Sequence, residues 1–514
     1  MAKGKRRNCL WVLVFLAICL PLGWSQAGND EASADQDAKG PTQAVPEDGT
    51  VPQNDAEPQA QTQASYSTAG MGIPSAEAPR RNYLLFGITG NESVQYAPAN
   101  NFSGPNATNS VTRVFGSVDY LRTKGRYQTS IDYRGGGFFF VNSDFPDSTR
   151  QVQQLSAQQR ISWNRTKLFL TDSLSNFPGG NFGAGWFGGT SAYNLGLPPG
   201  TAPTGTNVSN FFGFDTFGGL GQANYFTNVA LAEVTQEVTP RSALTFSGAY
   251  ALTDHIGNED FISSRQATAA VSYNYMLTHR STIGVFYGYQ DIRFVGGDSV
   301  MTNTVQGTFQ HSISSRTGFI LGGGPQFIRF NGPVELLFGS TPSLFTTTNH
   351  QTGASAFASV SHSLQHSSLA FSYNHQVTNG SGIFAGASSD IAQFTYGRAL
   401  SRLWGASFDA GFVRLSSIGN NSSGLLGNSY SYGFVGAAVQ RKIGQRFSFY
   451  ASYQFNDENY DRSSCAVTSN CSGLVGRHVA VVGIAWRSRP VVFGDSYDQN
   501  PGVQPVGSPP AVAP

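Results

Sequence analysis

The sequence predicts an all-β chain that forms a transmembrane, antiparallel up-and-down β-barrel of about 18 strands. Composition is the first reason. Charged residues make up 12% of the 514 residues, compared with roughly 25% in a typical soluble domain, whereas aromatic residues reach 13%. The mean hydropathy of −0.21 is nevertheless too polar for a helical membrane protein. A barrel reconciles these values, because every second residue of a membrane-spanning strand can be polar.

The second reason is an apolar pattern with a period of two residues. In the segment 281–290, Ile283, Val285, Tyr287 and Tyr289 alternate with smaller or more polar residues. Such alternation predicts a strand with two different faces. The same phase recurs in three further segments, whose expected lipid-facing residues are Tyr127, Thr129, Ile131 and Tyr133, then Trp404, Ala406, Phe408, Ala410 and Phe412, and finally Phe447, Phe449, Ala451, Tyr453 and Phe455.

The third reason is that short and long connections alternate along the chain. Tight turns are expected at 123–125, 164–166, 240–241, 279–280, 315–316, 365–366, 401–402 and 444–445. Longer Gly-, Asn-, Ser- and Asp-rich stretches lie near 91–109, 135–149, 175–222, 254–262, 294–299, 330–349, 378–388, 416–428 and 457–473. These connections join about 18 strands, an even number that leaves both chain ends on one side. A soluble sandwich or propeller would also alternate, but it would not explain this asymmetry.

The chain divides into four expected parts. Residues 1–27 resemble a signal peptide, with a basic start, an apolar stretch and small residues before Ala27. An uncleaved anchor helix is the alternative. Residues 28–79 are acidic and rich in Pro and Gln, which predicts a disordered linker. The barrel is expected over 80–489, and residues 490–514 should form a Pro-rich disordered tail.

Charge and cysteine usage fit an exported chain that does not bind nucleic acid. Residues 1–79 hold five of the 32 Lys/Arg and nine of the 31 Asp/Glu, so 27 minus 22 leaves about +5 for the rest. The Arg residues are dispersed and form no basic run that could follow phosphates. Beyond residue 27 only Cys465 and Cys471 remain, which predicts one small disulfide-closed loop. Two thiols alone cannot complete a zinc site.

Enzyme signatures are lacking, and neither an enzyme activity nor a cofactor is expected. The chain has no HExxH, P-loop or GxSxG motif. The segment 183–188 matches GxGxxG, but it lies inside a Gly- and Phe-rich loop rather than between a strand and a helix.

In architecture, residues 82–487 resemble the large bacterial outer-membrane barrel superfamily, which includes porins, substrate-selective channels and polysaccharide exporters. The resemblance implies an outer-membrane location, contact with outer-membrane lipid, insertion by the barrel-assembly machinery, and periplasmic N- and C-terminal tails. One feature departs from the family, whose barrels commonly end on an aromatic residue of the last strand. Here Trp486 is followed by a tail.

The alternation that turns the apolar residues outward turns a set of charged residues into the lumen, where water can hydrate them. These pore-lining candidates are Arg113, Asp119, Asp132, Arg134 and Asp409. A mixed-sign field of this kind favours selection of small hydrated solutes. The alternative is that opposite charges on neighbouring strands simply pair along the wall.

The longest loop, 176–222, is a candidate for constricting the lumen. A loop of this length is usually functional, and in general porins the third outer loop folds into the barrel. This loop resembles that one in order and length, and folding inward would bury Phe211, Phe212, Phe214 and Phe217. An external lid or a contact with neighbouring surface molecules is the alternative.

The sequence thus favours a porin-like channel for passive or selective diffusion of small hydrophilic solutes. Two alternatives remain open: an exopolysaccharide-export barrel, and a structural or adhesive surface barrel whose lumen is plugged. The solute or polysaccharide is not identified by the sequence, and a homo-oligomer is left open.

Overall fold

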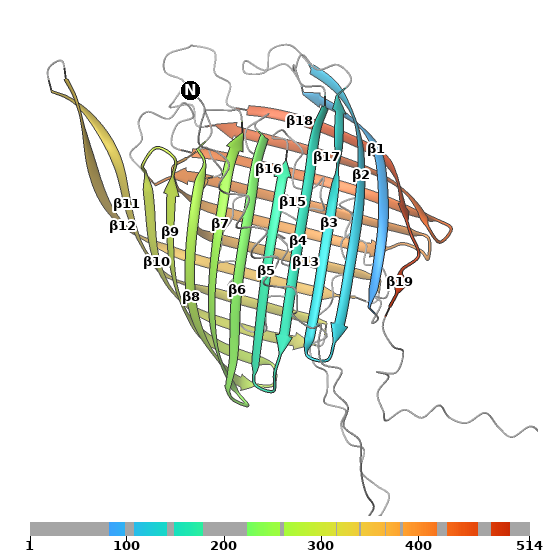
Figure 1. Ribbon diagram of the computed structural model, residues 1–514, viewed down its shortest axis with the longest axis horizontal. Coiled ribbons are helices and arrows are strands. Elements are labelled where there is room, and N and C mark those ends of the chain that lie inside the picture. The colour runs from blue at the N-terminus through green and yellow to red at the C-terminus, as the bar shows by residue number, and fades with distance from the viewer. Residues whose placement is uncertain are drawn as a thin grey trace, which may run out of the picture. The chain divides into compact units, whose positions relative to one another are not determined.

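The computed structural model describes residues 82–97, 107–140, 149–177, 224–256, 262–314, 316–338, 341–364, 366–380, 384–418, 429–460 and 474–493. These residues form one sheet of long antiparallel strands (Figure 1). The first six are β1 (Tyr83–Ala97), β2 (Ala107–Lys124), β3 (Tyr127–Phe140), β4 (Thr149–Ser162), β5 (Thr166–Phe177) and β6 (Asn224–Thr239). The next six are β7 (Ser242–Ile256), β8 (Ser264–Thr278), β9 (Ser281–Phe294), β10 (Ser299–Ser314), β11 (Thr317–Phe338) and β12 (Thr341–Ser363). The last are β13 (Ser367–Thr378), β14 (Ala387–Ala399), β15 (Trp404–Ser417), β16 (Ser429–Ile443), β17 (Phe447–Tyr460), β18 (Leu474–Arg487) and β19 (Val491–Val492).

The sheet closes on itself because β1 pairs with β18 as well as with β2. The β1–β18 ladder runs from Gly87 opposite Arg487 to Tyr96 opposite His478. Each of β1 to β18 therefore pairs with two neighbours, which removes the open edges that a flat sheet would expose. This closed antiparallel barrel of 18 strands confirms the fold class predicted from the sequence, and with it the architecture on which the resemblance to large outer-membrane barrels depends.

One boundary differs from the sequence prediction. The short strand β19 lies within the segment predicted as a disordered tail, where Val491 and Val492 pair with Leu84 and Tyr83. Two β-branched residues after Pro490 can continue the ladder of β1, because the β18 ladder stops at Gly87 opposite Arg487 and leaves that side of Tyr83 and Leu84 available. Among the described residues, no helix is long and apolar enough to cross a membrane.

The eight tight turns lie where the sequence placed them, but two of the predicted long loops are short. β11 and β12 continue their ladder to Phe338 opposite Thr341, so most of the predicted loop 330–349 is strand. The hairpin reaches beyond its neighbours (Figure 1). At the end opposite the eight tight turns, the stretch between β9 and β10 is a short connection, which Gly296 and Gly297 allow by adopting φ values of 124° and 100° that other residues rarely adopt.

The outer face is apolar, whereas the inner face buries many polar side chains beside apolar ones. On β9, Val285 is 59% exposed on the outer face, whereas Gln290 is 1% exposed on the inner face. All four apolar residues predicted to share one face of 281–290 are exposed, as are Tyr127, Trp404 and Phe447 in the other segments. Soluble proteins bury such residues and expose glutamines. An apolar outer face and a polar inner face are what a barrel in a bilayer requires.

Glycines allow side chains to cross over a strand on the inner face. Gln306 of β10 donates a hydrogen bond to the Ser355 hydroxyl of β12 at 2.9 Å, although β11 lies between them. The crossing point is Gly324, which is opposite Ser355 and has no side chain to obstruct it. A Cβ at this position would overlap the carbonyl oxygen of Val305.

Substituting Gly324→Ala should therefore lower the free energy of unfolding by about 1–3 kcal/mol, the usual effect of overpacking. Gly307→Ala is the matched control, because nothing lies within 4 Å of a Cβ built there. Urea unfolding of the two variants in lipid vesicles measures the difference. Equal stabilities would show that β11 can move aside at no cost.

Candidate functional site: the inner face of the barrel

Among the described residues, polar side chains gather on the inner face of the barrel, whereas the outer face is apolar. Alternate residues of neighbouring strands supply it, and many of their side chains are amides or hydroxyls. Examples on β8 to β11 are Gln266, Thr268, Gln290, Thr302, Thr304, Gln306 and Gln326, each 7% exposed or less. Such groups are neutral and can donate and accept hydrogen bonds, so they suit a hydrated solute without fixing its charge.

Charged residues of the inner face concentrate where the barrel closes. Asp119 on β2 is directly opposite Asp132 on β3. Two ionised carboxylates in this position would repel each other. The pair instead shares a side-chain hydrogen bond, and the Arg134 Nε lies 3.2 Å from a carboxylate oxygen of Asp132. Arg487 on β18 is within electrostatic range of both carboxylates. We name these four residues, Asp119, Asp132, Arg134 and Arg487, the seam cluster.

Gly87 of β1 lies between the strands that supply the seam cluster. It pairs with Arg487 on one side and with Ser117 on the other, on the inner face. A Cβ on Gly87 would lie 2.5 Å from the Ser117 hydroxyl oxygen. Without a side chain there, Arg487 can extend across β1 toward Asp119. The closing strands thus present adjacent positive and negative groups to one part of the inner face.

Farther along the same strands, aromatic rings surround a buried arginine. Arg113 is fully buried, and its guanidinium carbon lies 5.2 Å from the ring centroid of Phe138. Phe115 contacts the same ring edge to face at 5.5 Å. Asn91 donates a hydrogen bond to the Tyr450 hydroxyl at 2.8 Å, crossing β18 at Gly483. This part of the wall offers one cation among rings, a setting that strengthens cation–π attraction.

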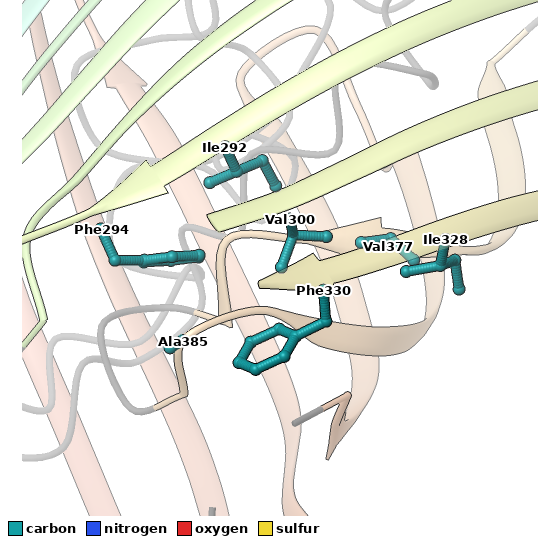
Figure 2. Close-up of a cluster of buried hydrophobic side chains, with 7 residues drawn as sticks. All are labelled: Ile292, Phe294, Val300, Ile328, Phe330, Val377 and Ala385. Carbon is teal, nitrogen blue, oxygen red and sulfur yellow. The ribbon is translucent and has the colours of Figure 1, made fainter. Parts of the chain in front are cut away.

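The connection between β13 and β14 lies against the inner face. Asn379 donates a hydrogen bond to the Ser264 hydroxyl at the start of β8, at 3.2 Å. Ala385 and Val377 join an apolar cluster with Ile292 and Phe294 of β9 (Figure 2). The remaining members are Val300, Ile328 and Phe330. Partial burial raises the pKa of the nearby Asp298 carboxyl, in the β9–β10 turn, above its ordinary value.

Because Asn379 contacts β8 and the cluster includes β9, β10 and β11, this connection spans several strands of the wall. Phe384 and Ala385 are 6% and 4% exposed. Gly386 has a φ of 92°, and a Cβ there would lie 2.7 Å from a methyl carbon of Val300. The positive φ and the close approach explain why glycine occupies this position. The described residues of this connection therefore lie against the inner face at the end of the barrel opposite the tight turns.

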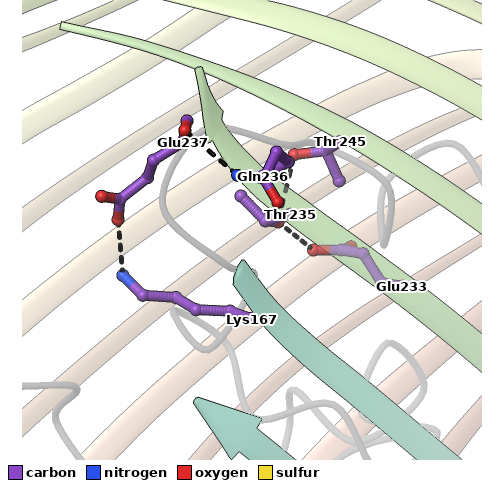
Figure 3. A network of polar contacts seen from close by, with 6 residues as sticks. All are labelled: Lys167, Glu233, Thr235, Gln236, Glu237 and Thr245. Atoms are coloured by element: carbon purple, nitrogen blue, oxygen red, sulfur yellow. Dashed lines mark hydrogen bonds and ion pairs between the residues drawn. The ribbon is translucent and has the colours of Figure 1, made fainter. Parts of the chain in front are cut away.

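A second polar network lies on β5, β6 and β7 (Figure 3). Glu233 is 2% exposed and accepts a hydrogen bond from Thr235, which also contacts Thr245 at 3.1 Å. Lys167 forms an ion pair with Glu237 at 3.4 Å near the tight turns. Glu233 thus adds a carboxylate to the inner face, at some distance along the sheet from the seam cluster.

The structure places the five charged candidates from the sequence on the inner face, but it does not gather them into one site. Asp119, Asp132 and Arg134 belong to the seam cluster. Arg113 lies farther along β2 among aromatic rings. Asp409 is on β15 opposite Thr395 and Gly436, separated from the seam by β16, β17 and β18.

Several expected site residues lie outside the described residues. They are the four aromatic candidates Phe211, Phe212, Phe214 and Phe217, and the cysteines Cys465 and Cys471. The inward fold of the loop 176–222 and the disulfide remain predictions. Within the described ranges, no group of three or more His, Cys, Asp or Glu could hold a metal ion.

Sequence reasoning missed three inner-face groups. Arg487 follows Trp486, so the two-residue alternation that points Trp486 outward could have placed Arg487 inside. Glu233 could have been found in the same way, because it alternates with the exposed Ala232 and Val234. Asn379 carried no such signal, because its contact with β8 is made by a residue in a connection rather than in a strand.

Comparisons with known proteins return only distant structural likenesses. No family model matches the chain, and no curated protein matches it. Among solved structures, it is similar to OccAB2 of Acinetobacter baumannii, with 10% identity, 79% of this chain and 98% of that chain covered, and a TM-score of 0.37. OccK2 (OpdF) of Pseudomonas aeruginosa in complex with glucuronate gives 10% identity, 79% and 98% coverage, and a TM-score of 0.38. A BenF-like porin from Pseudomonas fluorescens Pf-5 gives 9% identity, 79% and 99% coverage, and a TM-score of 0.39.

Proposed function

We propose that this chain is an outer-membrane channel through which small hydrophilic solutes diffuse selectively. The observation that carries the proposal is the closed barrel with a polar inner face and an apolar outer face. A barrel of ~18 strands is wide enough to leave an aqueous channel after its side chains are placed. The polar lining gives passing solutes hydrogen-bonding partners in place of the water they lose.

Selectivity follows from two features of the lumen. The seam cluster presents both signs of charge near the tight-turn end, so a solute with separated polar groups is favoured over a simple ion. The β13–β14 connection narrows the other end, so large solutes are excluded. A solute must pass both features in sequence.

A surface barrel with a closed lumen is the second candidate. Its supporting observation is the burial of the inner face, where Arg113 is 0%, Gln290 is 1% and Glu233 is 2% exposed. In a wide water-filled pore, such side chains would be exposed to water. This burial favours a restricted lumen, and a completely closed one would serve attachment rather than transport.

We also propose an orientation in which both tails are periplasmic, which the positions of the strand ends support. β1 begins with Tyr83 opposite Leu121, close to the β2–β3 turn, and β18 ends at Arg487, one residue after Trp486 pairs with Phe447 close to the β16–β17 turn. Both tails therefore leave the barrel on the tight-turn side. With the tight turns in the periplasm, as bacterial barrels generally have them, both tails are periplasmic.

Liposome swelling with sugars of graded size tests the proposal. We expect rapid swelling with monosaccharides and a sharp decrease with larger oligosaccharides, because the lumen is restricted. Liposomes that contain heat-denatured protein are the control. No swelling with any sugar, from protein that is shown to be folded and inserted, would reject the channel and favour the closed surface barrel.

A further inference from the structure

A basic residue occurs in every one of the eight tight turns. We name these residues the basic turn ring: Arg126, Arg165, Arg241, Arg280, Arg316, His366, Arg402 and Arg446. All eight are exposed. Seven of them are arginines, which are charged at any physiological pH. Because the turns follow one another around a closed sheet, the charges encircle one end of the barrel.

The backbone holds most of these residues in the same way. The carbonyl of Arg241 accepts a hydrogen bond from the Met276 N–H at 2.8 Å, and that of Arg280 accepts one from the Ser312 N–H at 2.8 Å. Equivalent bonds fix the carbonyls of Arg126, Arg165, His366 and Arg446. In three turns a hydroxyl two residues earlier also accepts the N–H of the arginine, as Thr239 does for Arg241 at 3.2 Å, with Thr278 and Ser314 acting in the same way. The guanidiniums therefore start from fixed backbone positions.

Negative charge is scarce beside the ring. Among the described residues next to the tight turns, the acidic side chain is Glu237, and it is paired with Lys167 at 3.4 Å. Further cations lie at the same end, namely Lys124, Arg441, Lys442 and Arg489. The opposite end differs, since acids such as Asp291 and Asp390 lie there beside bases such as Arg293 and Arg414. Among the described residues, the tight-turn end therefore has a rim of positive charge with few acidic neighbours.

Outward-facing aromatic residues lie at the level of the ring. Tyr127 is 44%, Trp163 is 41% and Trp404 is 40% exposed. The guanidinium carbon of Arg126 lies 5.5 Å from the ring centroid of Tyr127, and that of Arg441 lies 5.3 Å from the ring of Trp404. Tyrosine and tryptophan mark the depth at which a membrane protein meets lipid headgroups. These two contacts therefore place cations on the lipid side of the rim, at headgroup depth.

We propose that the basic turn ring binds the headgroups of anionic glycerophospholipids in the leaflet at the tight-turn end. Guanidiniums form paired hydrogen bonds with phosphate oxygens, and a lipid surface is the partner that can contact all the turns around a barrel at once. A protein partner would contact one side of the rim. The inference rests on the membrane location in the proposed function and is independent of conduction.

Spin-labelled lipids in vesicles that contain the folded full-length chain test this proposal. In phosphatidylcholine vesicles, spin-labelled phosphatidylglycerol should associate with the wild-type barrel about fivefold more strongly than spin-labelled phosphatidylcholine, equivalent to about 1 kcal/mol. Raising the salt concentration should reduce this preference, because exposed charges are screened.

Two variants that each remove four positive charges show which end of the barrel causes the preference for phosphatidylglycerol. The turn variant carries Arg126→Gln, Arg241→Gln, Arg280→Gln and Arg316→Gln, and it should lose the preference. The control variant carries Arg265→Gln, Arg293→Gln, Arg329→Gln and Arg414→Gln at the other end, and it should keep it. A third variant with Arg→Lys at the four turns should also keep most of the preference. If the turn variant does not fold, Arg241→Gln with Arg280→Gln alone should halve the preference.

The outcomes separate the inference from the function on which it rests. Equal association of both lipids with the wild type, or equal losses in the turn and control variants, would overturn the inference. Loss of binding to isolated peptidoglycan by the turn variant, with unchanged lipid preference, would overturn it in favour of a cell-wall contact. Failure of the wild type to insert into any vesicle would instead reject the membrane location itself.

Discussion

Single-channel conductance should rise severalfold when the β13–β14 connection between Thr378 and Ala387 is replaced by a short Gly–Ser link. The described part of this connection lies against the inner face. Asn379 donates a hydrogen bond to Ser264 at 3.2 Å, and Ala385 belongs to the apolar cluster of β9, β10 and β11. Removing it takes bulk out of the narrow end while leaving the ladder between β13 and β14 intact. Planar bilayer recordings measure the change.

Point substitutions separate constriction from a general effect on the barrel. Phe384→Ala removes a side chain that is 6% exposed within the connection and should raise conductance by a smaller factor. Phe371→Ala removes the same ring from the outer face of β13, where it is 39% exposed, and should leave conductance unchanged. An unchanged conductance in the correctly folded loop replacement would mean that the narrowest point lies elsewhere.

The second large effect is expected on stability. Arg134→Met should lower the free energy of unfolding by about 2 to 3 kcal/mol, because breaking a largely buried ion pair leaves an uncompensated charge. The Arg134 Nε lies 3.2 Å from Asp132, and Asp132 is directly opposite Asp119. Without the guanidinium, two carboxylates face each other on the strands that close the barrel. Guanidinium chloride unfolding in vesicles measures the loss.

A double-mutant cycle identifies the cause. Adding Asp119→Asn to Arg134→Met removes one of the two opposed carboxylates and should restore most of the lost stability. Arg316→Met, in an exposed turn, is the control and should change stability by at most about 0.5 kcal/mol. If the double variant is no more stable than Arg134→Met, the loss comes from side-chain packing rather than from repulsion between carboxylates.

Most of the fold could be predicted from the sequence because each face of a membrane-spanning strand contacts a different solvent. The alternation of Ile283, Val285, Tyr287 and Tyr289 with smaller or polar residues indicates which side of the strand faces outward, whatever the neighbouring strand is. The tight turns could also be predicted from the sequence, since few residue types allow the chain to reverse direction within two or three residues. Both signals are local, so neither needs a tertiary contact.

The strand ends near the longer connections were less predictable. The segment 330–349 contains Gly, Pro, Ser and Asn, which are typical of loops, yet β11 and β12 pair as far as Phe338 and Thr341. There the ladder hydrogen bonds outweigh the weak preferences of individual residues. The same reason explains β19, whose two valines add to β1 at a position that only the closed sheet provides.

Local sequence patterns predicted the barrel, its approximate strand number, the outward-facing phase and the inward direction of Arg113, Asp119, Asp132, Arg134 and Asp409. Which of these residues meet depends on contacts between strands that are distant in the sequence. Asp119 and Arg487 become neighbours because β18 pairs with β1, a contact between the two ends of the barrel that no local pattern encodes. Asn379 reaches Ser264 for a related reason, since a connection can cross the lumen to any strand. Local patterns report the solvent that each side chain faces, whereas closure and loop packing depend on the free energy of the whole sheet.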